Sequence, residues 1–319
     1  MDRGQVLSIP LRTRFRGITV REGMLFRGEA GWGEFSPFLE YDAPTSAPWL
    51  LAALEAANEG WPEPLRDRIP VNVTVPACGP EEAAAIVRAS NGCRTAKVKV
   101  AERGQSLADD QARVEAVREA IGDGLIRIDA NGGWSFDEAV TRIPLLDKAA
   151  GGLEYVEQPC ADVEDLAVVR RRVDVPIAAD ESIRRAEDPY RVRDLEAADI
   201  AVLKVQPLGG VRACLRIAED IGLPVVVSSA VESSVGIAAG VALAAALPVL
   251  DHACGLATVQ LLTDDVVGKP LLPVEGHLPV GRPEIDSGAL ARNRADEARA
   301  AHWEARLAEV RAACEDRRS

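Results

Sequence analysis

Acidic and basic residues recur at a nearly constant interval through the middle of the chain. Glu157 follows Asp129 by 28 residues, and Asp180 follows after a further 23. Lys204 comes another 24 residues later, and Lys99 precedes the group. Three carboxylates that converge on one point repel one another unless a cation lies between them. Hard oxygen ligands suit Mg²⁺ better than Zn²⁺, so the three acids predict a Mg²⁺ site, with Mn²⁺ as a substitute.

Each of these residues also has an ordinary interpretation. Lys99 is compatible with a surface lysine, Glu157 or Asp180 with a helix cap, and Lys204 with a structural ion pair. Five such residues with one shared spacing are much harder to explain as separate coincidences. The spacing therefore favours a single site, with lysines on either side of the carboxylates.

Further polar residues surround this group. In the segment LIRIDANGGW (125–134), alternation places Arg127, Asp129 and Asn131 on one face, and a capping box between Ser135 and Glu138 predicts that a helix begins directly afterwards. Arg127 is compatible either with a contact to a substrate carboxylate or with a buried structural ion pair. The candidate substrate contacts are Lys97, Arg127, Asn131, Ser228, Ser229 and Glu232. The last three lie at or just after the end of a predicted strand, where a helix N-cap is the alternative.

These residues belong to a regular alternation of apolar strands and helical patterns. Strands are predicted at residues 69–76, 95–100, 125–132, 153–159, 176–182, 200–207, 224–230 and 253–258. Eight strands in a repeat of about 25–30 residues favour a closed (β/α)₈-type barrel. A doubly wound open sheet is the second choice, because no GxGxxG motif follows the first strand. In a barrel, the five charged residues all lie at the carboxyl ends of their strands, where barrel enzymes have their active sites.

The two ends of the chain differ from the middle. Alternating apolar residues in the first sixty positions predict a small antiparallel sheet, closed by a short helix at residues 50–60. Residues 276–290 are expected to return to this unit, followed by a charged helix from about residue 293. We therefore predict an N-terminal α+β capping domain (1–68), a barrel catalytic domain (69–260) and a C-terminal segment (261–319). Phe35 of the cap is a candidate to cover a substrate ring.

Composition limits the partners and the compartment. The 319 residues include 37 Lys and Arg against 50 Asp and Glu, which gives a net charge of −13. This charge argues against nucleic acid and anionic membranes as partners, whereas a bound cation still permits a small carboxylate substrate. Homo-oligomerisation stays open. Six scattered cysteines without a CxxC pair, and an N-terminus without an apolar segment, predict a cytoplasmic protein with reduced thiols.

Five motifs, taken together and in order, resemble the enolase superfamily in its muconate-lactonizing-enzyme-like subgroup. They are TAKVKV (95–100), RIDANGGW (127–134), EYVEQP (154–159), AADES (178–182) and LKVQPLGG (203–210). The resemblance implies a (β/α)₇β barrel, an α+β cap built from both chain ends, one Mg²⁺ and removal of a proton α to a carboxylate. On the matching positions it implies Asp129, Glu157 and Asp180 as metal ligands. Lys99 and Lys204 correspond to the catalytic pair.

The histidines and the eighth strand discriminate among subgroups. A mandelate-racemase-like enzyme needs a His–Asp dyad at strand ends, and His252, His277 and His302 are not so placed. A dipeptide epimerase is expected to have paired aspartates at the eighth strand, where this chain has GLATVQ. Asp264 and Asp265 fall several residues later, which weakens this alternative but leaves it open.

The short chain and the segments FRGITVREGMLFRG (15–28) and GWGEFSPF (31–38) are most similar to the actinobacterial o-succinylbenzoate synthases. That resemblance implies a lyase of menaquinone biosynthesis. Its reaction is the syn-dehydration of 2-succinyl-6-hydroxy-2,4-cyclohexadiene-1-carboxylate to 2-succinylbenzoate through an enediolate. Lys99 would remove the α-proton and Lys204 would stabilise the intermediate. An N-acylamino acid racemase, a dipeptide epimerase and a catalytically silent barrel that only binds ligands are the alternatives.

Overall fold

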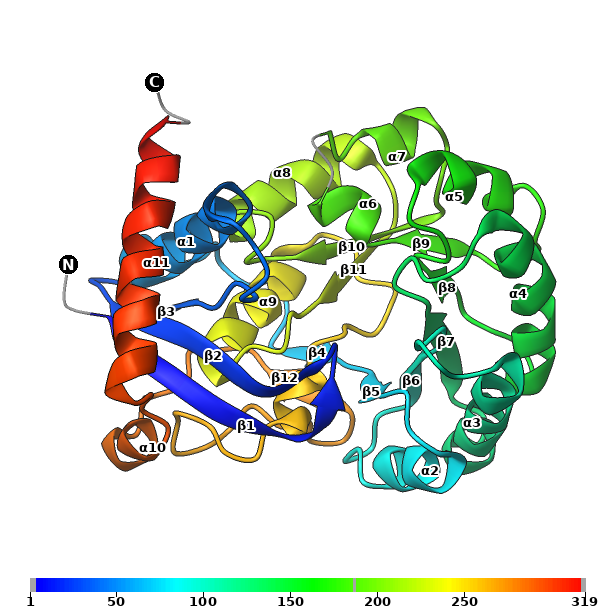
Figure 1. Cartoon of the computed structure of the whole chain (residues 1–319), viewed down its shortest axis with the longest axis horizontal. Helices are drawn as coiled ribbons and strands as arrows, with labels where there is room; N and C mark the ends of the chain where they lie inside the picture. The colour runs from blue at the N-terminus through cyan, green and yellow to red at the C-terminus, as the bar shows by residue number, and fades with distance from the viewer. Residues whose placement is uncertain (1–3, 186–187, 317–319) are drawn as a thin grey trace.

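Seven parallel strands curl around a common axis at the centre of the structure, with helices outside them (Figure 1). The computed structural model describes residues 4–185 and 188–316. The strands are β5 (Val73–Val75), β6 (Thr95–Lys99), β7 (Leu125–Asp129), β8 (Val156–Glu157), β9 (Ile177–Ala179), β10 (Ile200–Lys204) and β11 (Val225–Ser228), paired in this order. Because all seven run in the same direction, their carboxyl ends meet at one mouth, as the alternating pattern predicts.

The outer helices lie between the strands, as the predicted alternation requires. They are α2 (Pro80–Arg88), α3 (Leu107–Ile121), α4 (Phe136–Ala150), α5 (Val163–Arg170), α8 (Val211–Ile221) and α9 (Ser234–Ala246). The capping box at α4 is confirmed: Ser135 and Glu138 exchange side-chain and backbone hydrogen bonds. Two short helices between β9 and β10 were not predicted, α6 (Glu181–Arg184) and α7 (Arg191–Asp194). Four residues give too little periodicity to be recognised in a sequence.

The barrel closes through two residues rather than through a full eighth strand. Cys254 forms a parallel bridge with Val71, and Gly255 forms one with Ser228. The segment predicted as the eighth strand instead turns into the 3₁₀ helix η1 (Ala257–Leu261). Closure therefore depends on backbone hydrogen bonds at one short junction, including Asn72 N to Cys254 O at 2.9 Å.

The first predicted strand divides into two. Its start, β4 (Arg68–Pro70), pairs antiparallel with β12 (His277–Pro279), whereas β5 enters the barrel. The change of partner occurs at Val71, whose N–H donates to Gly276 O. Thus the C-terminal segment returns to the base of the barrel as well as to the cap.

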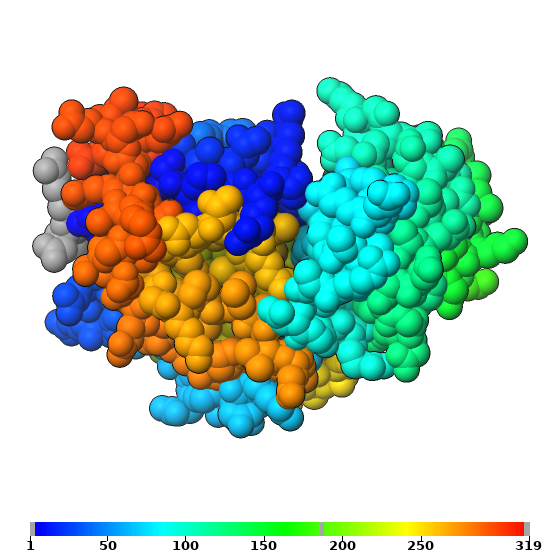
Figure 2. All heavy atoms as spheres, turned by 90° about the horizontal axis from the view of Figure 1, so that it is seen from below, coloured from blue at the N-terminus to red at the C-terminus, as the bar shows by residue number. Residues whose placement is uncertain are grey.

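The chain ends together form a second layer beside the barrel (Figures 1 and 2). Its sheet consists of β1 (Gln5–Phe15), β2 (Ile18–Arg27) and β3 (Trp32–Phe35), in that order. Helices α1 (Ala43–Asn58) and α11 (Glu297–Asp316) pack against it, and α10 (Ser287–Arg292) lies near one end. Trp303 meets the Phe35 ring edge-on at 5.9 Å, which joins the two ends of the chain. The turn between β1 and β2 therefore reaches the barrel from a fixed platform.

No helix among residues 4–185 and 188–316 combines the length and the apolarity needed to cross a bilayer.

Candidate active site

Strand register brings the predicted charged residues together at the mouth of the barrel. Lys99 pairs with Asp129 across β6 and β7, and Asp129 pairs with Glu157 across β7 and β8. Asp180 follows directly after β9, and Lys204 ends β10. The three carboxylates are fully buried. Carboxylates at this depth require compensating positive charge, and the neighbouring strands supply it.

Three ammonium groups contact the carboxylates. Lys97 Nζ lies 2.5 Å from Glu157 Oε1 and 2.9 Å from Asp129 Oδ2. Lys99 Nζ lies 2.5 Å from Asp129 Oδ2, and on the far wall Lys204 Nζ lies 2.6 Å from Asp180 Oδ2. These contacts form two groups of alternating charge, Lys99–Asp129–Lys97–Glu157 and Lys204–Asp180, which together are called the lysine–carboxylate cluster below.

The cluster shifts the pKa values of its members in opposite directions. Burial, together with the charge of Asp129, raises the pKa of Glu157 to about 7. Burial opposes ionisation of Asp129, yet the ammonium groups of Lys97 and Lys99 hold its pKa well below the usual range. Burial lowers the pKa of Lys99, and the positive charge of Lys97 lowers it further, against the attraction of Asp129. The direction for Lys99 is the one that a lysine base requires.

The three carboxylates offer the oxygen donors that a divalent cation prefers. Their side chains, however, are not arranged around a common ion position. Among residues 4–185 and 188–316, no three Asp, Glu, His or Cys side chains are arranged so as to hold a metal ion. The lysine ammonium groups contact the carboxylates instead, and Arg184 Nε donates to Asp180 Oδ1 at 2.8 Å. Glu157 Oε2 is buried without a hydrogen-bond partner, which leaves one strong acceptor at the centre of the trio unsatisfied. A cation among the three acids would satisfy it.

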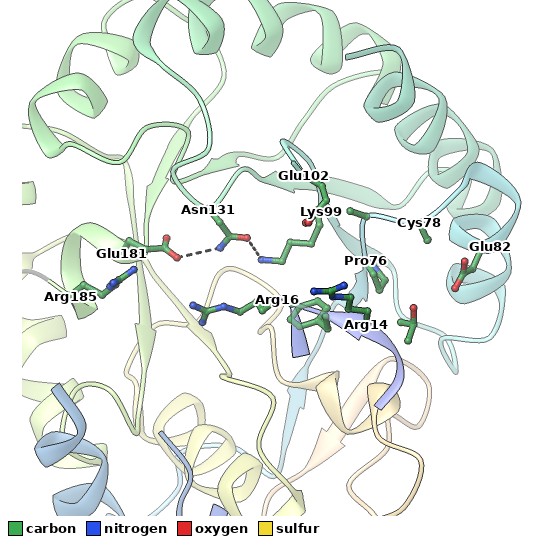
Figure 3. A pocket seen from close by; sticks show the side chains of 14 residues that line it. Arg14, Arg16, Pro76, Cys78, Glu82, Lys99, Glu102, Asn131, Glu181 and Arg185 are labelled. Atoms are coloured by element: carbon green, nitrogen blue, oxygen red, sulfur yellow. Dashed lines mark hydrogen bonds between the residues drawn. The ribbon is translucent and has the colours of Figure 1, made fainter. Parts of the chain in front are cut away.

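A cavity of about 490 Å³ opens in front of Lys99 (Figure 3). Asn131 Oδ1 accepts a hydrogen bond from Lys99 Nζ at 2.7 Å, and Asn131 Nδ2 donates to Glu181 Oε1 at 3.3 Å. The polar residues around the cavity include Arg14, Arg16, Lys99, Asn131, Glu181 and Arg185. A second, narrower cavity of about 30 Å³, called the inner part below, shares Lys99 and Asn131 with the first and is also lined by Lys97 and Lys204. The two predicted catalytic lysines therefore line the same inner part.

The predicted substrate contacts divide into two groups. Asn131, Ser228 and Ser229 line the cavity, and Ser229 Oγ lies 2.7 Å from Thr258 Oγ1. Lys97 also lines the inner part, although its ammonium group is engaged by carboxylates.

Arg127 and Glu232 do not line either part of the cavity. Arg127 is fully buried one residue layer below the mouth, where its guanidinium contacts Glu154, Tyr155 and Ala253 O. The structural ion-pair interpretation therefore fits its contacts. Glu232 is buried at the boundary with the cap and accepts a hydrogen bond from Ala230 N.

Several residues at the mouth were not predicted. Phe15 and Phe38 line the cavity from the cap, and the Phe15 ring centroid lies 5.6 Å from Lys99 Nζ. Phe35, the candidate ring cover, is instead fully buried within the cap. Arg16 stacks on Phe38, with its guanidinium carbon 4.3 Å from the ring centroid. The available signal was the basic run RTRFRG in an otherwise acidic chain, at a turn that ends in Gly17.

Two family descriptions match the chain: Enolase C-terminal domain-like over residues 81–284 and Enolase N-terminal domain-like over residues 6–57. Among solved structures, muconate lactonizing enzyme from Pseudomonas putida superposes with a TM-score of 0.77 at 21% identity, covering 92% of this chain and 98% of that one. L-Ala-D/L-Glu epimerase from Bacillus subtilis gives 0.74 at 24% identity, covering 88% and 96%. At these identities the structures establish the shared fold.

Curated relatives are much closer in sequence. The o-succinylbenzoate synthase of Thermobifida fusca (strain YX) is 68% identical over 98% of this chain and 97% of its own length. Those of Mycolicibacterium smegmatis and Mycobacterium tuberculosis (strain H37Rv) are 57% and 55% identical, each over 95% of this chain and over 93% and 92% of their own lengths. With the barrel, the cap and the lysine–carboxylate cluster in place, the chain belongs to the o-succinylbenzoate synthase family of the enolase superfamily.

Proposed function

We propose that this chain dehydrates 2-succinyl-6-hydroxy-2,4-cyclohexadiene-1-carboxylate to 2-succinylbenzoate, a step of menaquinone biosynthesis. The observation that carries the proposal is the placement of two lysines on opposite walls of one cavity. Lys99 ends β6 and Lys204 ends β10, four strands apart in a ring of seven strands and one closing segment. A substrate between them presents one face to each. The near-full-length identity to synthases of this name supports the same reaction.

Lys99 is the proposed base. In its neutral form the amine takes the proton α to the substrate carboxylate, and the C–H electron pair passes into an enediolate. When the ring C–O bond then breaks, the same ammonium group returns the proton to the departing hydroxyl, which leaves as water from the same face. The ring gains its aromatic double bond, so atoms and charge balance. The lowered pKa of Lys99 supports this role.

Lys204 is the proposed stabilising cation. Its ammonium group lies 2.6 Å from Asp180 Oδ2 and lines the inner cavity. A fixed positive charge on the far face lowers the energy of the anionic intermediate without exchanging a proton. Asn131 Oδ1 holds the Lys99 ammonium group on the near face at 2.7 Å.

Enzymes of this superfamily generally use a divalent metal, typically Mg²⁺. We propose Asp129, Glu157 and Asp180 as its ligands here, since all three are buried at adjacent strand ends and one oxygen of Glu157 has no partner. When bound, the ion supplies positive charge that stabilises the enediolate form of the substrate carboxylate. Ser228 and Ser229 are the proposed hydrogen-bonding contacts for the rest of this small carboxylate substrate, because they line the same cavity.

The test is direct. Purified protein with the cyclohexadiene carboxylate and Mg²⁺ should form the aromatic product, followed by its ultraviolet absorbance. Exhaustive chelation should abolish turnover, and added Mg²⁺ or Mn²⁺ should restore it. Asp129→Asn should bind Mg²⁺ at least tenfold more weakly in calorimetry. Full turnover after chelation would reject the metal assignment, and the absence of aromatic product from the metal-loaded protein would reject the function.

Racemisation of an N-acylamino acid is a second candidate, because two lysines on opposite faces permit proton removal on one face and return on the other. The distinguishing measurement is deuterium incorporation at the α-carbon of both enantiomers. A racemase incorporates deuterium into either enantiomer at a rate comparable to dehydration. A dedicated synthase does not.

A further inference from the structure

Three charged side chains lie buried between the cap and the barrel, outside the cluster described above. They are Arg21 of β2, Glu34 of β3 and Glu232 of the loop between β11 and α9, and each is 5% exposed or less. None of them lines the cavity. Burying charges is costly, and groups of this kind are retained in some proteins because they fix one geometry. Their contacts show what is fixed.

Two of the three hold the loop that forms one wall of the cavity. Arg21 Nε donates to Val231 O at 3.1 Å, and its guanidinium also donates to Ser36 O. Glu232 Oε2 accepts from Ala230 N at 2.7 Å. Val231 has φ +65°, a left-handed conformation that a β-branched residue adopts only under constraint. The hydrogen bonds from Arg21 to Val231 O and from Ala230 N to Glu232 supply that constraint, one on each side of the Val231 Cα.

Glu34 holds the start of the helix that follows. Its Oε2 accepts from Ser233 N at 3.2 Å, from Gly236 N at 3.1 Å and from Ser233 Oγ at 2.5 Å. A Cβ at position 236 would lie 2.5 Å from Glu232 Cβ and 3.0 Å from Glu34 Oε2. Glycine at this position thus leaves room for both carboxylates at the N-terminus of α9.

A second connection reaches the neighbouring strand. Gln206, two residues after Lys204, accepts from Ser36 N and donates to Ser36 Oγ, both at 3.1 Å. Ser36 Oγ donates in turn to Glu34 Oε1 at 2.7 Å. The cap therefore holds the segments after both β10 and β11.

We propose that Arg21, Glu34 and Glu232 are positioning residues, through which the cap fixes the cavity wall formed by residues 228–231 beside Lys204. The proposed catalytic groups are on the barrel, whereas the shape of this wall is set by Arg21 and Glu34 of the N-terminal sheet together with Glu232 of the loop itself. The kinetic part of the test rests on the proposed dehydration; the exchange part does not.

The experiment compares Arg21→Lys with Arg66→Lys. Lysine keeps the charge of Arg21 but cannot reach Val231 O and Ser36 O together. Arg66 is a matched control, since it also donates to several carbonyls, including Ala244 O and Leu247 O, away from the cavity. Arg21→Lys should raise KM about tenfold, with kcat changed less than threefold, and should speed amide hydrogen exchange in residues 228–233. Arg66→Lys should leave KM and that exchange unchanged.

A second background, Val231→Gly, tests whether Arg21 acts through the conformation of Val231. Glycine adopts φ +65° without strain, so Val231→Gly removes the need for the constraint. In that background Arg21→Lys should change KM less than threefold. Equal effects in both backgrounds, or a loss of kcat at constant KM without local exchange, would show that Arg21 only stabilises the fold. If wild-type protein forms no aromatic product, the proposed function fails, and the exchange result still decides the positioning role.

Discussion

Lys97 Nζ lies between two carboxylates, 2.5 Å from Glu157 Oε1 and 2.9 Å from Asp129 Oδ2. Its side chain is 7% exposed, and this burial acts to lower the pKa of Lys97. The charges of Asp129 and Glu157 outweigh burial and raise the pKa of Lys97 well above its ordinary value. Lys97 is therefore a permanent cation in the metal-free protein. Its place beside two proposed metal ligands makes it a counter-charge that a bound ion would partly replace.

Lys97→Met should consequently destabilise the metal-free protein more than the metal-loaded protein. Removing one partner of a buried ion pair costs about 3 kcal/mol or more, because the other charge is left uncompensated. Denaturant unfolding with chelator and with saturating Mg²⁺ measures both values. An equal loss in the two conditions would contradict the idea that the ion and Lys97 neutralise the same carboxylates.

The two proposed catalytic lysines should respond differently to replacement by arginine. Lys99→Arg should lose about 10³-fold or more in kcat, because a guanidinium keeps its proton at any working pH and cannot act as a base. Lys204→Arg retains the charge and should keep more residual dehydration. The measurement is solvent-deuterium exchange at the substrate α-carbon beside the dehydration rate. Near wild-type exchange in Lys99→Arg would mean that another group is the base.

Arg127 should matter for stability rather than for substrate binding. Arg127 Nε donates to Glu154 Oε2 at 2.9 Å, and Glu154 Oε1 lies 2.7 Å from His252 Nδ1, all below the mouth. Arg127→Met should cost about 3–5 kcal/mol in the free energy of unfolding, with little change in KM of the folded fraction. A KM increase of tenfold or more at unchanged stability would indicate that Arg127 contacts the substrate.

Glu232 gives a pH dependence of stability whose sign can be worked out. Burial, together with the charge of Glu34, raises the pKa of Glu232 to about 7 against the attraction of Arg21. Between the ordinary carboxyl pKa and 7, the unfolded chain releases this proton and the folded chain keeps it. The free energy of unfolding therefore falls as pH rises through that window, by up to about 3 kcal/mol, and then levels off.

The check uses the neutral isostere. Glu232→Gln still offers an oxygen to Ala230 N, but it has no proton to release. Its unfolding free energy should fall less than that of the wild type between pH 5 and pH 8. Parallel curves for the two proteins would show that Glu232 is ionised throughout that range.

The sequence predicted the mouth of the barrel because its spacing is enforced by the repeat. Each βα unit returns the chain to the same rim, so Asp129, Glu157 and Asp180 converge whatever the details of packing. The spacing does not predict how deep in the barrel each side chain lies. Arg127 shares a face with Asp129, yet two residues along a strand amount to about 6.6 Å, enough to move a side chain from the mouth into the interior.

The cap contacts were beyond sequence reasoning for a related reason. Phe15, Phe38 and Arg16 reach the cavity because the cap packs on the barrel at one particular angle, which no local pattern encodes. Glu232 follows a barrel strand and so resembled a ligand-binding residue. Its own hydrogen bond is local, from Ala230 N, whereas the adjoining Ser233 donates to Glu34, 199 residues away in the sequence.

The closure of the barrel through Cys254 and Gly255 has a consequence for synthesis on the ribosome. Val71 and its partner Cys254 are about 180 residues apart, so the ring stays open until nearly the whole barrel has been translated. During that interval β5 and β11 present unpaired edges rich in valine. Such edges can pair with those of another chain. Nascent or prematurely terminated chains ending before residue 254 should therefore be the species that most need chaperones, however stable the completed protein is.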